Sequence, residues 1–276
     1  MPRTKMNVAM HYCYYTRLGK PVRKVITRPI ISAAAGTYMD TPASKSLIEG
    51  FARKNKLDLS EYLKEDYKCF NDFFTRRIKP EARPVCYDPD CLISPCDGYM
   101  SAYKIGRESE FFIKESYYTV EDLVGGADIA ADYMGGTCLV MRLGVENYHR
   151  YCYIDDGFKS RNYHINGRYN PVLPIVVRNH PVFVQNTREY SIMETKNFGT
   201  VVQIEVGACL VGRIVNHHEA CVMKRGTEKG YFQFGGSTIV LLFREGVLDI
   251  PDELFEATGE GKEAMVKCGQ AIARKA

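Results

Sequence analysis

A serine preceded by two glycines is the part of this sequence whose residue types most directly suggest chemistry. Gly235, Gly236 and Ser237 stand immediately before a continuous apolar run, 238–243. A glycine bend or bulge at the start of a buried strand would explain this arrangement without any reaction. Alternatively, the Ser237 hydroxyl could attack the carbonyl of Gly236 and convert the peptide bond to an ester, which requires a bent backbone and a base. These three residues alone leave both interpretations open.

Two further stretches offer the other groups of an acid, histidine and serine arrangement. Asp97 lies in a turn, SPCDG (94–98), which follows a short apolar stretch. His149 lies in a strand-like run, 142–151. Taken separately, Asp97 is an ordinary turn residue and His149 an ordinary core imidazole. The sequence predicts a reaction centre only if folding brings Asp97, His149 and Ser237 together.

The elements that must position these residues are mainly strands. From residue 91 onward, short β-branched and aromatic runs alternate with Gly and Asp turns, which is typical of a β-rich domain with many hairpins. We expect strands at 138–143, 148–154, 182–185, 201–206, 210–215 and 238–243. Two segments, 222–226 and 265–269, share a hydrophobic–basic–glycine pattern and predict two similar hairpins. The acidic segment 252–261 is expected to be a surface excursion.

The N-terminal part of the chain has helical patterns instead. Pro21 and Pro29 limit a short basic helix within segment 11–35, where Arg and Lys stand beside apolar residues. Such a segment can contact an anionic membrane surface, or it can be a solvated helix packed on its own domain. The residues alone favour neither alternative.

A second helix is expected at 43–55, where apolar residues recur at helical spacing and Thr41 or Ser44 can cap the first turn. The fold class is therefore expected to be α+β, with N-terminal helices followed by a β-rich catalytic domain. We place an N-terminal helical, membrane-contacting region at 1–66 and the β-rich domain at 67–276.

Composition excludes several classes of protein. The net charge is only +4, and no strip of interleaved basic and aromatic residues is present, so nucleic acid is not an expected partner. The ten cysteines are dispersed and the chain does not begin with a signal peptide, which indicates reduced thiols. Cys86, Cys91 and Cys96 lack a Cys-x-x-Cys pair, so no metal site is expected. No apolar run approaches the ~20 residues needed to span a bilayer.

Four motifs occur in the same order as in a known family. They are FNDFFTRRIKPEARPV (70–85), SPCDG (94–98), NYHRY (147–151) and FGGST (234–238). Segments 204–208 and 210–212 agree as well. With these motifs the chain resembles the phosphatidylserine decarboxylases, a pyruvoyl-dependent, self-processing enzyme family, over roughly residues 45–276.

The resemblance implies a reaction at the Gly236–Ser237 bond. Ser237 would attack Gly236, splitting the chain into a β chain, 1–236, and an α chain, 237–276, and Asp97 and a histidine would serve Ser237 in this step. Ser237 would become the covalent pyruvoyl cofactor, which forms a Schiff base with the amine of phosphatidylserine. The cofactor would accept the electrons released as carbon dioxide leaves, and the product would be phosphatidylethanolamine.

One position departs from the family pattern. Many members carry two histidines in the pattern Tyr-His-Arg-x-His, the second assigned to self-cleavage and the first to decarboxylation. This sequence has His149 at the first position and Cys152 at the second. Either His149 performs both tasks or another histidine takes part, and His164 is the nearest candidate. Cys152 would need a strongly lowered pKa to act as a base, so we expect His149 to be the catalytic histidine.

A lipid substrate also bears on where the protein works. The resemblance implies phosphatidylserine in an anionic membrane as the partner, and the basic segment 11–35 becomes a plausible contact with that membrane. Together with reduced cysteines, this places the protein peripherally on the cytoplasmic face of the cell membrane. Whether the chain forms a homo-oligomer is left open.

Three alternatives compete with this interpretation. Relatives with the same cofactor decarboxylate soluble aromatic amino acids, and membrane attachment would discriminate against them. A non-catalytic β-barrel or carrier-like domain would be expected to have lost Ser237, Asp97 or His149, yet all three are present. A serine hydrolase would carry a Gly-x-Ser-x-Gly turn between a strand and a helix, which Gly-Gly-Ser-Thr does not match.

Overall fold

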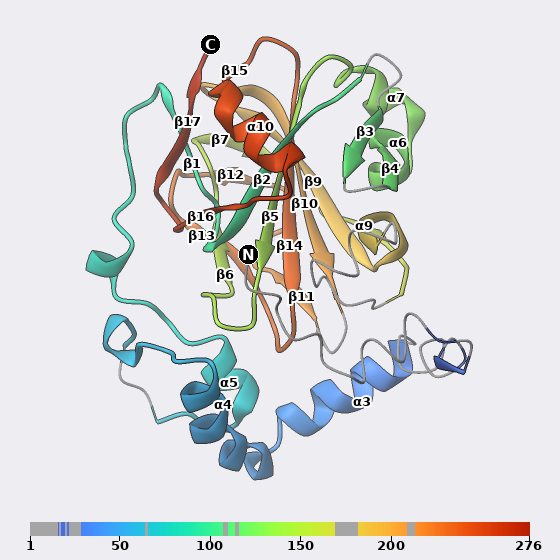
Figure 1. Ribbon diagram of the computed structural model, residues 1–276. Coiled ribbons are helices and arrows are strands. Elements are labelled where there is room, and N and C mark those ends of the chain that lie inside the picture. The colour runs from blue at the N-terminus through green and yellow to red at the C-terminus, as the bar shows by residue number, and fades with distance from the viewer. Residues whose placement is uncertain are drawn as a thin grey trace.

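The computed structural model describes residues 16, 18–19, 21, 29–63, 66–106, 110–113, 116–168, 182–208 and 213–276. A group of short helices lies at one end of a body made mainly of strands, with one helix lying across the other end (Figure 1). The predicted α+β fold class is confirmed. The basic helix expected between Pro21 and Pro29 falls at 22–28, outside the described residues.

Five short helical elements form the N-terminal group. They are α3 (Pro29–Met39), η1 (Pro42–Leu47), α4 (Ile48–Lys54), η2 (Leu59–Glu61) and α5 (Phe70–Phe74). The helix predicted at 43–55 is present, but its first turn is a 3-10 helix and the α-helix proper begins at Ile48. Thr41 occupies the N-cap position without capping, because its hydroxyl donates to the Tyr38 carbonyl instead.

Ser44 connects two of these helices. Its buried hydroxyl donates to the carbonyls of Met39 and Thr41 and accepts a hydrogen bond from the Phe70 amide at 2.9 Å. The hydroxyl therefore joins the start of η1 to the first residue of α5. The predicted helix-capping role of Ser44 is replaced by a tertiary one.

The body is built on one large antiparallel sheet. In spatial order its strands are β12 (Cys221–Met223), β7 (Gly157–Lys159), β9 (Arg188–Thr195), β10 (Gly199–Gly207), β14 (Ser237–Phe243), β5 (Thr137–Leu143), β2 (Gly98–Lys104) and β16 (Ala264–Val266), and β8 (Tyr163–Ile165) also pairs with β9. Every residue of β14 is buried, as its uninterrupted apolar run predicts for a central strand. The predicted strands at 138–143, 201–206 and 238–243 correspond to β5, β10 and β14.

Three smaller sheets pack around this one. Their strands are β11 (Ile214–Asn216), β13 (Glu228–Phe232) and β6 (Arg150–Cys152) in the first, β1 (Cys91–Ile93), β17 (Ala271–Lys275) and β15 (Leu248–Asp249) in the second, and β3 (Glu110–Ile113) and β4 (Ser116–Thr119) in the third. The main hydrophobic core includes Tyr151, Phe232 and the apolar residues of β5, β10 and β14. The predicted strand at 148–154 is the shorter β6, and the strand predicted at 210–215 overlaps β11, while 209–212 lies outside the described residues.

Short helices complete the body. They are η3 (Pro80–Ala82), α6 (Val120–Val124), α7 (Ala127–Ala131), α9 (Val182–Gln185) and α10 (Asp252–Gly259). The strand predicted at 182–185 is wrong, because this segment is α9. The Arg188 guanidinium donates to the Val184 carbonyl at 2.7 Å and so satisfies a helix-end acceptor that the local pattern could not reveal. The acidic excursion predicted at 252–261 is mostly α10, whose Thr258 hydroxyl accepts from the Ala102 amide of β2.

The two predicted hairpins have similar turns but are not hairpins. Gly226 and Gly269 both adopt positive φ, at 75° and 83°, in turns closed by the carbonyls of Lys224 and Lys267. Each turn connects strands of two different sheets, β12 to β13 in one case and β16 to β17 in the other. The shared pattern therefore marks two similar crossings between sheets, and both glycines lie against Val85.

Candidate active site

Ser237 lies at the start of the central strand. It pairs with Gly207 of β10 on one side and Leu143 of β5 on the other, and no part of it is exposed. The turn before it depends on Gly235, which adopts φ 137°, a conformation that favours glycine. Gly235 therefore has the unusual backbone conformation, whereas Gly236, the residue whose carbonyl Ser237 would attack, is not among the glycines with positive φ. Ser237 is therefore shielded from solvent and paired with a strand on each side.

The His149 imidazole lies directly beside the Ser237 hydroxyl. Ser237 Oγ and His149 Nδ1 are 3.3 Å apart, and His149 Nε2 is 2.9 Å from the carbonyl oxygen of Gly144. Because a carbonyl oxygen only accepts, Nε2 carries the proton and Nδ1 presents its lone pair to Ser237. This is the tautomer that can remove the serine proton.

The surroundings of His149 keep it neutral. Burial is the largest cause, and together with the positive charge of Arg76 it lowers the pKa of His149 to about 3, although the hydrogen bond to Gly144 favours the charged form. At neutral pH the imidazole is therefore uncharged, and the lone pair on Nδ1 is available to act as a base. No proton has to leave the ring before Ser237 can be activated.

The lowered pKa of His149 predicts a specific acid sensitivity. Unfolding exposes the ring and restores its ordinary pKa near 6.5, so the unfolded chain binds a proton that the folded chain does not between about pH 6.5 and pH 3. Stability should therefore be lost as the pH falls through this range, with His149 contributing up to about 1.4 kcal/mol per pH unit. We expect denaturant titrations of Ser237→Ala to show this slope and of Ser237→Ala/His149→Phe to show a shallower one. Equal slopes would contradict the assignment.

Helix α5 supports both sides of the site. The Phe74 ring packs on the His149 ring, with 4.2 Å between their centroids, and the Phe232 amide donates to the His149 carbonyl at 2.9 Å. The imidazole is thus fixed by a helix on its face and by a strand through its backbone. These contacts explain why its ring can hold one orientation toward Ser237.

The segment before Ser237 is fixed by the same helix. Asn71 Oδ1 accepts from the Phe234 amide at 3.0 Å, and Asn71 Nδ2 donates to Asp40 at 2.8 Å. The Phe234 ring meets those of Phe70 and Phe74 edge-on, at 5.0 and 5.3 Å between centroids. We call this cluster, Phe51, Phe70, Phe73, Phe74 and Phe234, the aromatic clamp. The clamp joins the N-terminal helices to the residues that precede the Gly236–Ser237 bond.

Arg76 is a buried cation near His149. Its guanidinium donates to the Tyr62 hydroxyl at 3.2 Å and lies over the Tyr62 ring, 4.2 Å from the centroid. Within the described part of the chain, Arg76 has no carboxylate partner and its Nε has no hydrogen-bond partner. The site therefore contains a positive charge that no carboxylate of the described residues compensates.

Asp97 does not contact His149 in this structure. Its carboxylate accepts two hydrogen bonds from Arg83 Nε and Nη2, at 2.8 and 2.6 Å, and one from the Cys268 amide at 2.9 Å. The sheet register places Tyr99 of β2 opposite Arg142 of β5, and Leu143 of β5 opposite Ser237 of β14. Asp97 therefore lies just before β2, and β5 stands between β2 and the strand that carries Ser237. The predicted arrangement of Asp97, His149 and Ser237 is only partly assembled, because the Gly144 carbonyl takes the place expected for the acid.

Cys152 lies at the Asp97 turn and not beside Ser237. Its amide donates to the Pro95 carbonyl at 2.9 Å, and its sulfur is 3.6 Å from that of Cys268. Cys268 in turn donates its thiol to the Pro95 carbonyl. Cys152, which occupies the position of the second histidine in the family pattern, is thus in contact with another free thiol.

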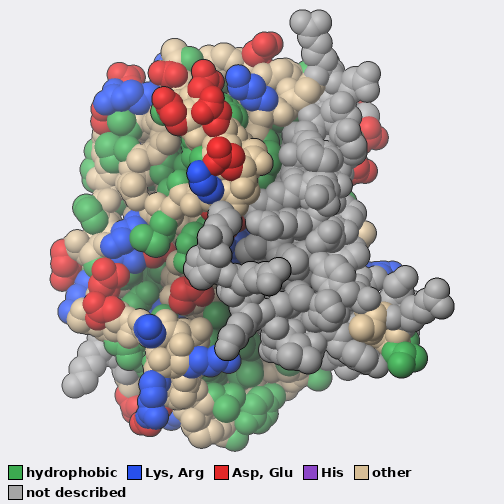
Figure 2. Space-filling view, in the orientation of Figure 1, with side chains coloured by type: hydrophobic (Ala, Val, Ile, Leu, Met, Phe, Trp, Pro, Cys, Tyr) green, Lys and Arg blue, Asp and Glu red, His purple; other side chains and the backbone are tan. Residues whose placement is uncertain are grey.

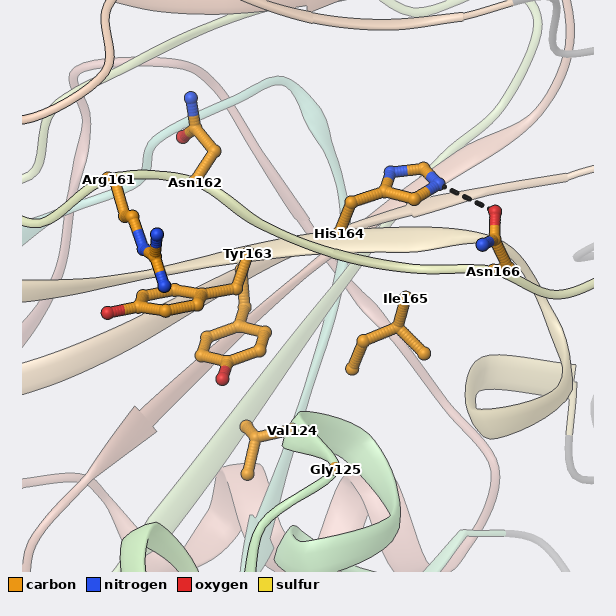
Figure 3. Close-up of a pocket in the computed structure, with 9 residues that line it drawn as sticks. Val124, Gly125, Arg161, Asn162, Tyr163, His164, Ile165 and Asn166 are labelled. Carbon is orange, nitrogen blue, oxygen red and sulfur yellow. Dashed lines mark hydrogen bonds between the residues drawn. The ribbon is translucent and has the colours of Figure 1, made fainter.

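His164 lies in a different part of the protein. It lines a cavity of 660 Å³ with Arg161, Tyr163 and Tyr190, and its ring contacts Asn166 (Figure 3). In the sheet it is separated from β14 by β9 and β10, which corresponds to about 14 Å. The geometry therefore favours His149 over His164 as the partner of Ser237.

His217 and His218 are also exposed. They contact Glu228 and Tyr153 respectively, and not Ser237.

Sequence reasoning did not single out several residues of this site. Asn71, Phe74 and Arg76 belong to the FNDFFTRR stretch, which had marked the family without a role for each side chain. Their signal was the presence of polar residues among three phenylalanines, since a buried polar side chain in such a stretch must find a partner. The Gly144 carbonyl could not be found, because a backbone acceptor leaves no trace in residue types.

Comparison with known proteins identifies the family of the chain. The family model described as phosphatidylserine decarboxylase matches residues 70–274. The chain is 43% identical over 267 residues to phosphatidylserine decarboxylase proenzyme 2 of Clostridium acetobutylicum, covering 96% of this chain and 91% of that protein. It is 38% and 37% identical over 272 residues to the phosphatidylserine decarboxylase proenzymes of Clostridium botulinum and Clostridium perfringens, covering 96% of this chain and 92% of each. The chain therefore belongs to the phosphatidylserine decarboxylase family.

Proposed function

We propose that this chain is a self-processing, pyruvoyl-dependent phosphatidylserine decarboxylase whose cofactor derives from Ser237. The observation that carries the proposal is the contact between the Ser237 hydroxyl and the unprotonated Nδ1 of a neutral, buried His149. A serine that served only as a strand residue would not need a base whose other nitrogen is fixed by a carbonyl. The relatives named as proenzymes support a reaction in which the chain is cut.

In the first step His149 acts as a general base. Its Nδ1 takes the hydroxyl proton while Ser237 Oγ attacks the Gly236 carbonyl, so a C–O bond forms and the C–N peptide bond breaks. The proton passes to the departing nitrogen of residue 237. Loss of a Cα proton then expels the Gly236 carboxylate, and hydrolysis releases ammonia and leaves a pyruvoyl group on chain 237–276.

The residues around the bond fit such a group. Residue 237 begins a rigid central strand and is excluded from water, and the buried Thr238 Oγ1 has no hydrogen-bond partner within the described part of the chain. When formed, the pyruvoyl group supplies a reactive carbonyl and accepts the electrons released on decarboxylation. His149 remains adjacent to residue 237 and can hold or return a proton there. Arg76 supplies positive charge for an anionic substrate.

We propose that Asp97 is a positioning residue. It fixes the 94–98 turn through Arg83 and the Cys268 amide, and the turn leads into Gly98, where a Cβ would lie 2.8 Å from the Arg142 carbonyl. This close approach sets the pairing of β2 with β5, the strand that neighbours Ser237. Asp97 would thus act on the nucleophile through two strands.

Asp97→Asn tests this role. Removing one charge of a buried ion pair should lower the free energy of unfolding by about 3–5 kcal/mol, and processing should slow only as far as folding is impaired. Asp155→Asn is the matched control, because that carboxylate is equally buried and accepts from Asn197. Measurement of stability and of the cleaved fraction separates the alternatives. A stable Asp97→Asn chain that is not cleaved would show that Asp97 acts directly in the chemistry.

We also propose that the protein acts peripherally on an anionic membrane at the cytoplasmic face. The N-terminal helices expose Tyr38, Leu47 and Leu59 together with the basic residues Lys45 and Lys54. Figure 2 shows hydrophobic and basic side chains gathered at this end of the molecule. None of the helices in the described segments is long and apolar enough to cross a membrane.

Two measurements on the purified protein test the function. Intact mass under denaturing conditions should give two chains, 1–236 and 237–276, the second carrying a pyruvoyl terminus. Carbon dioxide release should then occur with vesicles containing phosphatidylserine, and not with soluble aromatic amino acids. Release from the amino acids alone would favour the alternative decarboxylase. A single uncut chain that is inactive with both substrates would contradict the proposal.

A further inference from the structure

Two thiols meet at the Asp97 turn, outside the Ser237–His149 pair. Cys152 Sγ and Cys268 Sγ are 3.6 Å apart, and both residues hydrogen-bond the Pro95 carbonyl, Cys152 through its amide and Cys268 through its thiol. The Cys268 amide is also held by Asp97. The two sulfurs are therefore fixed in contact by one turn, and a bond length of about 2 Å requires only a further approach of the side chains.

The positions of the two cysteines relative to the cut give the contact a consequence. Cys152 lies in β6, within 1–236, whereas Cys268 lies in the crossing between β16 and β17, within 237–276. In the uncut chain, a disulfide between them would close a loop within one polypeptide. After cleavage at Gly236–Ser237 the same bond would join two separate polypeptides.

We propose that Cys152 and Cys268 are a redox-modification site, at which a low-molecular-weight disulfide such as oxidised glutathione forms a covalent link between the two chains. Cys268 is the first to react, because it is partly exposed while Cys152 is buried. Its thiolate attacks the glutathione disulfide and releases one glutathione. Cys152 then attacks the mixed disulfide and releases the second. Two S–H bonds are lost, one S–S bond forms, and oxidised glutathione is reduced to two glutathione molecules.

Access and pH should shape this reaction. A cavity of 220 Å³ beside the Asp97 turn is lined by Asp97, whose carboxylate accepts from the Cys268 amide, and by Lys267, the residue before Cys268. The hydrogen bond to Cys152, followed by burial, raises the pKa of Cys268 well above the ordinary thiol value. The thiolate fraction is then small at neutral pH, so the rate should rise roughly tenfold per pH unit in alkaline buffer.

The linkage between two chains rests on the proposed cleavage, so the experiment uses cut and uncut protein. Purified wild-type protein and the Ser237→Ala chain are incubated with oxidised glutathione at pH 8.5, alkylated, and analysed without reductant. In wild type, chains 1–236 and 237–276 should be replaced by one species whose mass is their sum less two hydrogens, plus the alkyl groups on cysteines other than Cys152 and Cys268, and dithiothreitol should restore the two chains. In Ser237→Ala, peptide mapping should show the same Cys152–Cys268 linkage within one chain.

The variants and outcomes separate this inference from the function. Cys268→Ser and Cys152→Ser should abolish the link, whereas Cys138→Ser, which removes a buried thiol of β5, should leave its yield unchanged. If wild type is uncut but the linkage is mapped, the cleavage proposal fails and the thiol pair stands. If both thiols remain alkylatable after oxidation and unfolding, or glutathione stays on Cys268, the pair is overturned. The mapping of unsubstituted protein decides this even where a variant does not fold.

Discussion

The Ser237→Ala chain is expected to remain one full-length polypeptide with no decarboxylase activity. In the proposed mechanism the hydroxyl is both the attacking group and the source of the cofactor, so its removal should eliminate self-cleavage and catalysis together. The chain should still fold, because alanine fits the fully buried position and only the hydrogen bond to His149 is lost. We expect a loss of stability of about 1–3 kcal/mol, because the buried His149 Nδ1 is left without its donor, measured by denaturant titration, and a single intact mass under denaturing conditions.

Ser191→Ala is the matched control. Ser191 is also fully buried in the large sheet, and its hydroxyl has no hydrogen-bond partner in the described part of the chain. This variant should be cut and active like the parent protein. Cleavage of Ser237→Ala between residues 236 and 237 would require a different nucleophile and would end the proposed mechanism.

Replacing His149 with phenylalanine is expected to slow self-cleavage by a factor of about 10²–10⁴, the usual contribution of a positioned base. Phenylalanine keeps a ring against Phe74 but offers no lone pair to Ser237. The rate can be followed by purifying the uncut chain from a short expression and measuring the cleaved fraction over time. Any cut fraction of this variant should also turn over substrate more slowly, because it lacks the imidazole that stays beside residue 237 in the cut parent protein.

His164→Phe separates the loss of a base from the loss of any histidine. His164 is half exposed and contacts Glu189 and Asn166, so its substitution should leave the cleavage rate unchanged. The opposite result, normal cleavage of His149→Phe with failure of His164→Phe, would assign the base to His164 in β8. A folding probe such as near-ultraviolet circular dichroism shows whether either chain has lost its tertiary packing.

The parts of the fold that the sequence revealed are those with a strong local pattern. The apolar run that became β14 could only be a buried element, and Gly235-Gly236-Ser237 marked its unusual start. The segment 182–185 shows the limit, because four apolar residues suit a strand or a helix equally until Arg188 supplies a partner for the helix end. The similar turns at Gly226 and Gly269 were visible, but strand pairing depends on distant segments and was not.

The site was predictable in its residue types and only partly in its geometry. The identity of Ser237 and His149 as partners followed from the motifs, and the structure places them in contact. The contact of Asp97 with Arg83 did not follow, because two residues close in sequence, at 83 and 97, had no visible reason to pair across a turn. The Gly144 carbonyl is the hydrogen-bond partner of His149 Nε2, where an acid was expected. A backbone partner of this kind can be recognised only in the three-dimensional structure.

The aromatic clamp has a consequence for the history of each molecule. It fixes Phe234 against helices that lie far earlier in the chain, so Ser237 reaches its reactive geometry only after the two ends of the sequence have met. In the proposed mechanism, expulsion of the Gly236 carboxylate cannot be reversed by later unfolding. A cut chain is therefore a permanent record that its N-terminal helices once docked correctly. The fraction of cut chains therefore reports how many molecules have docked these helices at least once, including molecules that have since unfolded.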